Sequence, residues 1–119
     1  MRLLFDQNIP QPLLKHITGH ELLHAYHAGW GDLVNGDLIA AAEAARFDVL
    51  VTADQSLRYQ QNLAARRIGL LVFSTNSWPV IRENIPQIAA AIAREGQGTY
   101  LEVEFPRPVL NRRPPQRTP

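Results

Sequence analysis

Short apolar runs recur along the chain and end at polar or turn-forming residues, a pattern that predicts strands. The run at 48–52 is uninterrupted and β-branched at Val49 and Val51, as expected for a strand covered on both faces. Residues 99–105 alternate between apolar and polar positions instead, which predicts a half-exposed edge strand. The predicted strands are residues 2–5, 21–26, 48–52, 68–73 and 99–105.

Apolar residues at helical spacing fill most of the intervals between these runs. Asn35 is a suitable N-cap for one helix, and Pro86 is expected to kink or divide another. Strands that alternate with helices predict an α/β fold whose central sheet is mostly parallel, built from right-handed crossovers. The predicted helices are residues 10–18, 35–46, 59–66 and 78–95.

The composition fits one globular domain followed by a tail. Of the 119 residues, 45% are hydrophobic and 19% are charged, which is close to the composition of ordinary soluble domains. The last fourteen residues hold five prolines and four arginines but no acid, which predicts an extended segment that does not pack. We therefore expect a domain at residues 1–105 and a Pro/Arg-rich tail at residues 106–119.

The formal net charge of +1 conceals a division between this body and its tail. Residues 1–105 carry eight basic and eleven acidic side chains. A body with this balance lacks the broad basic surface that drives non-specific binding to nucleic acid. Basic contacts to RNA must therefore come from a small part of the body, from the tail or from a partner protein.

The chain contains no cysteine, which excludes disulfides, thiolate–zinc sites and a cysteine nucleophile. Four histidines lie close together in the sequence, but their spacing fits no closed zinc motif. The first apolar run meets Asp6 too soon to form the core of a signal peptide or a membrane span. The expectation is a cytoplasmic protein without membrane association. The histidines are His16, His20, His24 and His27.

Two aspartates follow predicted strands: Asp6 comes directly after residues 3–5, and Asp54 comes after residues 49–52 with Ala53 between. The carboxyl ends of parallel strands meet at one edge of a sheet, where open α/β sheets form their ligand crevice, so we expect these carboxylates to converge. Asp37, at the start of a predicted helix, is a third candidate. Converging carboxylate oxygens suit Mg²⁺ or Mn²⁺, which prefer hard oxygen ligands.

Each candidate also has an ordinary structural role. Asp6 and Asp54 could cap the helices that follow them, and Asp37 could complement the dipole of its own helix. Asn8 could be a further oxygen ligand or hold a water, although an Asn before Ile-Pro is more often a turn residue. Glu43 should not share the helix face of Asp37, and we expect it to face solvent.

Two parts of the sequence resemble PIN-like proteins. Residues 37–42, followed by Val-Leu-Val-Thr-Ala-Asp at 49–54, resemble the carboxyl half of PIN-domain ribonucleases. Residues 3–10, Leu-Leu-Phe-Asp-Gln-Asn-Ile-Pro, are similar to the start of the compact PIN-like family often called the DUF5615 or Mut7-C-like group. The resemblance implies a three-layer α/β/α PIN-like fold and Mg²⁺- or Mn²⁺-dependent RNA hydrolysis, as in VapC-type toxins. It also implies a small antitoxin encoded nearby.

Carried over residue by residue, the resemblance implies that Asp6, Asp37 and Asp54 are catalytic and hold the metal. Thr52 matches the hydroxyl residue of the family's Thr-x-Asp turn. Two departures stand out. Classical PIN nucleases carry a further acid on a helix between the first strand and the later helix, and that segment is abbreviated here. Relatives with the compact opening commonly have a glutamate where this chain has Gln7.

The leading prediction is therefore a metal-dependent endoribonuclease, the toxin of a toxin–antitoxin pair. The alternative is a catalytically weak or inactive PIN-like module that binds a protein partner or RNA, as the missing acid and Gln7 indicate. A phosphatase-like hydrolase with Asp6 as nucleophile fits less well, because the acid expected two positions later is Asn8.

Contacts beyond the acids are less sharply predicted. Trp30 and Trp78 could stack on unpaired bases, although anchoring in the core or a loop is the commoner role. The alternating edge at residues 99–105 could pair with a second copy in a homodimer, as PIN-like proteins commonly dimerise. Arginines that could meet RNA phosphates flank the helix predicted after Asp54 or lie in the tail. They are Arg58, Arg66, Arg67, Arg112 and Arg113.

Overall fold

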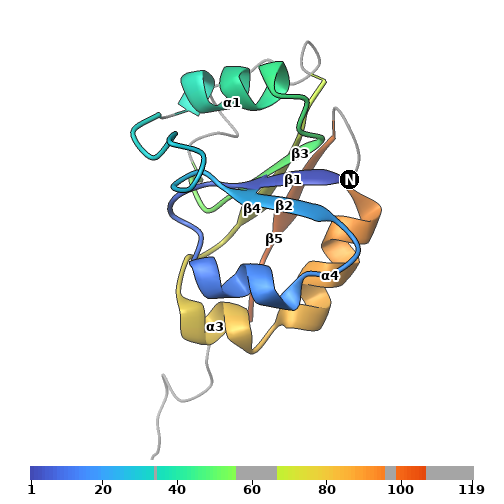
Figure 1. The fold of residues 1–119 in the computed structure, drawn as a ribbon. Helices are drawn as coiled ribbons and strands as arrows, with labels where there is room; N and C mark the ends of the chain where they lie inside the picture. Colours follow the sequence, from blue (N-terminus) through green and yellow to red (C-terminus); the bar gives the residue numbers. More distant parts are fainter. Residues whose placement is uncertain (34, 56–66, 96–98, 107–119) are drawn as a thin grey trace, which may run out of the picture.

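The computed structural model describes residues 1–33, 35–55, 67–95 and 99–106. The described residues form a five-stranded sheet in the order β2-β1-β3-β4-β5, and every neighbouring pair is parallel (Figure 1). The α/β fold with a parallel sheet is therefore confirmed. The strands are β1 (Arg2–Phe5), β2 (Glu21–His24), β3 (Val49–Thr52), β4 (Gly69–Phe73) and β5 (Tyr100–Val103).

The strand order reverses its direction at the centre of the sheet. From β1 the chain moves outward to β2, then returns to place β3 on the other side of β1, and β4 and β5 follow outward from there. Every residue of β3 and β4 is buried, which explains why their sequences are continuous apolar runs. β5 lies at one edge of the sheet, as its alternating pattern predicted.

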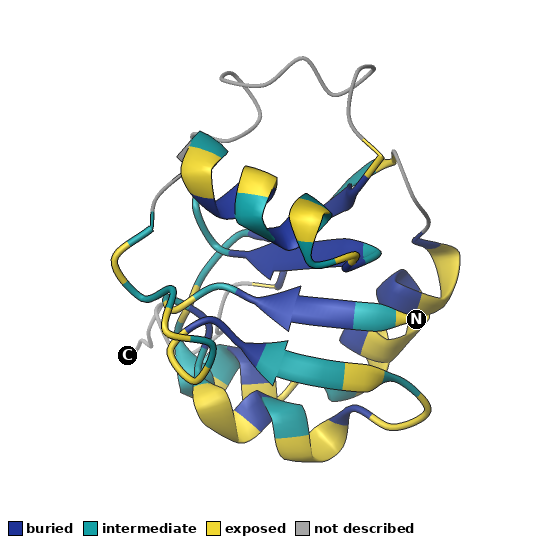
Figure 2. Cartoon of the chain, turned by 45° about the horizontal axis from the view of Figure 1, so that its top comes forward, coloured by how far each residue is buried: buried dark blue, intermediate teal, exposed yellow. Residues whose placement is uncertain are grey.

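Helices cover both faces of this sheet (Figures 1 and 2). On one face α1 (Asn35–Ala44) packs Leu38, Ile39 and Ala42 into a cluster with residues of the strands. The opposite face carries η1 (Gln11–His16), α3 (Trp78–Arg82) and α4 (Ile85–Arg94), whose apolar side chains join a second cluster. Figure 2 shows the buried residues on the strands and on the helix sides that face them.

Proline and backbone conformation account for the departures from the predicted helices. The segment predicted as a helix at 10–18 forms only the 3-10 helix η1, with Pro10 at its N-cap and Pro12 in its first turn. Pro86 divides the last helical pattern, because α4 begins anew at Ile85 with this proline in its first turn. α1 ends before the predicted Arg46, which adopts a left-handed φ of 65°.

The packed body of the fold reaches at least Phe105. The Phe105 ring packs edge-on against Phe73 with centroids 5.2 Å apart, and its backbone N–H donates to Ser74 Oγ at 3.0 Å. The predicted tail beyond residue 106 and the predicted helix at 59–66 lie outside the described residues. Among the helices that the structure describes, none is long and apolar enough to cross a membrane.

Candidate functional site at the carboxyl edge of the sheet

The carboxyl ends of β1 and β3 lie side by side where the strand order reverses. Phe5 is in register with Val51, and the N–H of Asp6 donates to the Val51 carbonyl at 2.8 Å, so the pairing continues one residue beyond β1. In open α/β sheets the crevice at such a reversal is the usual ligand site. The sequence prediction that Asp6 and Asp54 leave the sheet at this edge is therefore confirmed.

The buried hydroxyl of Thr52 connects these two aspartates. It donates to Asp6 Oδ2 at 2.7 Å and accepts the backbone N–H of Asp54 at 3.0 Å. Thr52 has no exposed surface, so this hydroxyl is held by the core while the carboxylates at its sides remain partly accessible. One side chain thus fixes both the orientation of the Asp6 carboxylate and the turn that carries Asp54.

Asn8 ties the loop after β1 to the end of β3. Its Oδ1 accepts the backbone N–H of Ala53 at 3.1 Å. This bond also fixes the side-chain amide, because only the oxygen can accept from an N–H group. Asn8 therefore positions the two loops of the site, which is the turn role weighed for it in the sequence.

The electrostatics of the site centre on Asp6. Burial raises the pKa of its carboxyl above the ordinary 3.8, while hydrogen bonds from Thr52 and from the N–H of Gln7 oppose the rise. The negative charge of Asp54 raises the pKa of Asp6 further. A cation bound here would offset the charge of Asp54 that disfavours ionisation of the partly buried Asp6, and carboxylate oxygens are ligands that fit Mg²⁺ or Mn²⁺.

Asp37 is not joined to this pair in the structure. It lies exposed in the first turn of α1, which runs antiparallel to the strands and so begins on the same side of the sheet as their carboxyl ends (Figure 1). Among the described residues, however, no three His, Asp or Glu side chains come together in a group that could hold a metal ion. The carboxylates assembled at the edge are those of Asp6 and Asp54.

His24, at the end of β2, is a neighbour of the site that the sequence did not single out for this role. It is 2% exposed, its Nε2 lies 2.8 Å from the Ile9 carbonyl, and its Nδ1 accepts the N–H of Tyr26 at 3.2 Å. With Nδ1 accepting, Nε2 carries the proton and donates to Ile9. The ring thereby links the loops after β1 and β2. The sequence feature that could have identified His24 is its position at the end of an apolar run, as for Asp6.

The ring of His27 meets that of His24 edge-on with centroids 6.3 Å apart, and each of the other three histidines also has a further neighbour. His16 contacts Trp78, His20 lies 3.2 Å from the amino terminus of Met1, and His27 pairs with Gln11.

The predicted arginine contacts receive no support at this edge. Arg67 is exposed and precedes β4, at the opposite edge of the sheet. Its backbone N–H donates to Glu43 Oε2 at 2.8 Å, and the N–H of Ile68 bonds to the same oxygen at 3.3 Å. The expectation that Glu43 simply faces solvent is therefore wrong, because it binds the backbone before β4. Arg58, Arg66, Arg112 and Arg113 lie outside the described residues.

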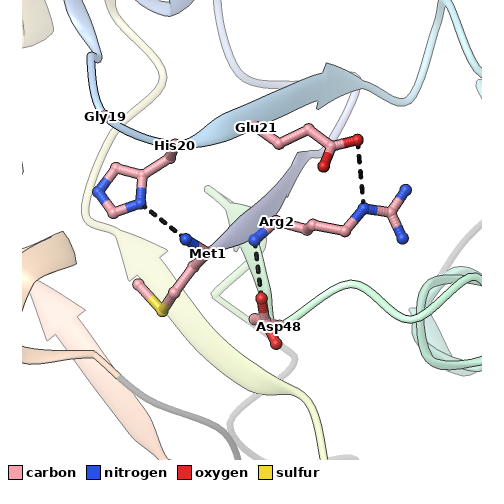
Figure 3. Close-up of a pocket in the computed structure, with 6 residues that line it drawn as sticks. All are labelled: Met1, Arg2, Gly19, His20, Glu21 and Asp48. Atoms are coloured by element: carbon pink, nitrogen blue, oxygen red, sulfur yellow. Dashed lines mark hydrogen bonds and ion pairs between the residues drawn. The ribbon is translucent and has the colours of Figure 1, made fainter.

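A hollow of about 550 Å³ lies at the amino edge of the sheet, away from the carboxyl edge (Figure 3). Arg2 contacts both acids that line it. Its side-chain Nε lies 3.4 Å from Glu21 Oε2, and its backbone N–H donates to Asp48 Oδ2 at 2.7 Å. These contacts hold the starts of neighbouring strands together. The hollow lacks the convergent carboxylates of the opposite edge.

Comparison of the chain with protein-family models, with curated proteins and with solved structures gave no match. The assignment of a function consequently depends on the chemistry of the carboxyl edge and on the sequence motifs. That edge offers two carboxylates, a buried hydroxyl between them, and loops after β1 and β2 that hydrogen bonds link to each other.

The role of Thr52 can be tested independently of any activity. Thr52→Val is expected to raise the pKa of Asp6 further, because it removes a donor that stabilises the ionised carboxylate. The free energy of unfolding should fall by about 1–3 kcal/mol, the cost of leaving a buried acceptor unsatisfied. NMR titration of the carboxyl groups and urea unfolding measure the two effects. Thr52→Ser keeps the hydroxyl and should match the parent; an unchanged Asp6 titration in Thr52→Val would contradict the assigned bond.

Proposed function

We propose that the protein is a metal-dependent endoribonuclease of PIN-like type, acting as the toxin of a toxin–antitoxin pair and hydrolysing phosphodiester bonds in RNA. The observation that carries the proposal is the Asp6–Thr52–Asp54 arrangement at the reversal of the strand order. Helices on both faces of the parallel sheet support interpretation as a three-layer α/β/α PIN-like fold.

In this proposal Asp6 and Asp54 hold Mg²⁺ or Mn²⁺, and substrate phosphate completes the coordination together with waters. Asp37, on the same side of the sheet, is the third carboxylate that the family resemblance implies. The chemistry supplied by the bound ion is activation of a water and neutralisation of charge that develops on the phosphate.

The remaining residues of the site act by orientation. Thr52 holds one oxygen of Asp6 and the backbone N–H of Gln7 holds the other, so the orientation of this carboxylate is fixed. Asn8 and His24 keep the flanking loops in place through the N–H of Ala53, the carbonyl of Ile9 and the N–H of Tyr26. Mutation of a residue that makes such a supporting bond typically lowers metal affinity or activity by about 10–100-fold.

A specific observation favours a second candidate function, a PIN-like module that binds RNA or a protein without cleaving. No group of three metal-holding side chains is present among the described residues, and the position after Asp6 carries the exposed amide Gln7. With two carboxylates the metal would bind weakly and hydrolysis would be slow. In either case the proposed partners are RNA and a small antitoxin, and β5 is the edge available for pairing with a second copy.

Cleavage of a mixed-sequence RNA by the purified full chain, free of any partner, tests the first candidate against the second. We expect cleavage in Mn²⁺ that EDTA abolishes, together with saturable Mn²⁺ binding in calorimetry. Folded protein that neither binds Mn²⁺ at millimolar concentration nor cleaves would refute the nuclease proposal and leave the binding module.

A further inference from the structure

Tyr26 stands out on the loop after β2, at the same edge of the sheet as the candidate site. Its residue exposure is 64%, whereas the other large hydrophobic residue exposed among the described residues, Met1, reaches 38%. Most aromatic side chains bury their rings, because a large apolar face is costly to leave in water. The exposure of Tyr26 beside the candidate site therefore calls for an explanation.

The exposure of Tyr26 does not come from a loosely held loop. The backbone of Ala25 donates to the Phe5 carbonyl at 2.7 Å, and Trp30 donates back to the Ala25 carbonyl at 2.9 Å. The N–H of Tyr26 itself is held by His24 Nδ1, and its ring meets the His27 ring edge-on with centroids 5.4 Å apart. The loop is thus pinned at its base, so the ring is presented in a defined place.

Trp30 serves as the inward anchor of this loop. Its ring packs edge-on against Phe47 with centroids 6.3 Å apart and belongs to the apolar cluster under α1. This is the anchoring role weighed for it in the sequence, and the outward aromatic of the loop is Tyr26. One loop consequently carries an aromatic that holds it down and an aromatic that faces solvent.

The Tyr26 ring lies close to the metal-holding end of β1. A Cβ placed on Gly31 would lie 3.0 Å from Gln7 Oε1 and 4.0 Å from Tyr26 Cδ1. The absence of a side chain at Gly31 therefore lets the side chains of Gln7 and Tyr26 approach the same point. Ala25, the residue before Tyr26, donates to the carbonyl of Phe5, the residue before Asp6, so the loop that carries the ring adjoins the end of β1.

The charge of the described residues limits how RNA could be held there. They include six Lys and Arg side chains against eleven Asp and Glu, so phosphates meet no broad basic surface. Stacking of a base on an aromatic ring needs no such surface, tolerates any base and is available only to bases that are unpaired.

We propose that Tyr26 is a stacking platform for an unpaired base next to the phosphate held at Asp6 and Asp54. This inference rests on the proposed function for the position of the phosphate. The base-binding role of Tyr26 is nevertheless separable from cleavage and can be measured without it.

Binding of a short, labelled, mixed-sequence RNA to the full chain in EDTA, followed by fluorescence anisotropy, tests the platform. Tyr26→Ala should raise the Kd for the single strand about tenfold, within the range for loss of one stacked base, while Tyr26→Trp should bind as well as the parent. The ratio of the two Kd values should stay constant as salt is raised, because stacking neutralises no phosphate. A blunt RNA duplex should show no dependence on Tyr26.

Two sets of outcomes separate this inference from the nuclease proposal. Equal single-strand affinity for the parent and Tyr26→Ala, an equal loss for duplex, or no RNA binding by the parent would overturn the platform and leave Tyr26 as a surface for a protein partner. If RNA binding depends on Tyr26 but no Mn²⁺-dependent RNA cleavage is found, the stacking role of Tyr26 is supported and only the nuclease proposal is overturned. If cleavage occurs, Tyr26→Ala should raise KM and leave kcat nearly unchanged, since the ring touches no reacting atom.

Discussion

Asp6→Asn and Asp54→Asn should each reduce Mn²⁺-dependent RNA cleavage at least about a hundredfold, since loss of a direct ligand exceeds the usual effect of a supporting residue. An amide keeps the shape of the carboxylate. Asn at position 6 can accept from the Thr52 hydroxyl or from the N–H of Gln7, though not from both, and the bond from the Asp54 N–H to Thr52 does not involve the side chain of Asp54, so the fold should survive. What is lost is a negative charge that, in the proposed site, would bind the cation. Initial cleavage rates at saturating Mn²⁺, together with circular dichroism, measure the effect.

The matched control for Asp54 is Asp48, which lies just before β3 and therefore at the opposite edge of the sheet. Asp48→Asn makes the same chemical change next to the same strand, and the amide oxygen can still accept the N–H of Arg2. It should cleave like the parent. A folded Asp54→Asn variant that cleaves as fast as Asp48→Asn would remove Asp54 from the site.

The same substitution at Asp6 should stabilise the fold while it inactivates the site. The folded-state pKa of Asp6 is raised above 3.8, so this carboxyl favours folding below that pH, and its contribution is lost as the pH rises through the folded pKa. At neutral pH the ionised side chain thus disfavours the metal-free fold, and an amide does not. Asp6→Asn should have the higher Tm in EDTA at neutral pH, with the difference narrowing toward acid. A lower Tm at neutral pH would contradict the assigned burial of charge.

Phe73→Ala should lower the free energy of unfolding by about 3–5 kcal/mol, the usual cost of removing a fully buried phenyl ring. The ring has no exposed surface, fills the cluster under α3 and α4, and packs against Phe105. Because small domains are stable by about 5–15 kcal/mol, this single change removes a large share of the total.

Urea unfolding gives the measurement for Phe73, with Tyr26→Ala as the control. Tyr26 is an aromatic of similar size but mostly exposed, so its removal should change the free energy of unfolding by less than about 0.5 kcal/mol. Similar effects of the two substitutions would show that burial of Phe73 against Phe105 does not contribute as the structure indicates.

The sheet and the position of Asp6 and Asp54 at one of its edges were predictable because both depend on short, local sequence patterns. A strand covered on both faces must be apolar throughout, and β3 and β4 are fully buried as their runs predicted. The first polar residue after such a run must leave the sheet. That argument placed Asp6 and Asp54 at one edge without knowledge of the strand order.

What the sequence did not reveal depends on pairings between distant segments. The hydroxyl of Thr52 reaches a carboxylate 46 residues away, and Glu43 binds backbone groups 24 and 25 residues further along. Periodicity also cannot tell an α-helix from a 3-10 helix where prolines restrict the backbone, as at Pro10 and Pro12. Asp37 illustrates the same limit, because its helix was predicted but its distance from the other acids was not.

The position of β1 beside β3 also has a consequence for how the protein is made. β1 is synthesised first and is almost wholly apolar, yet Leu3 pairs with Val49, which the ribosome adds much later. At roughly 5–20 residues per second, the strand waits several seconds for this neighbour. Because β1 pairs with β3 across this long separation and not through a hairpin, its apolar residues remain without that neighbour until the chain has been extended by more than forty residues.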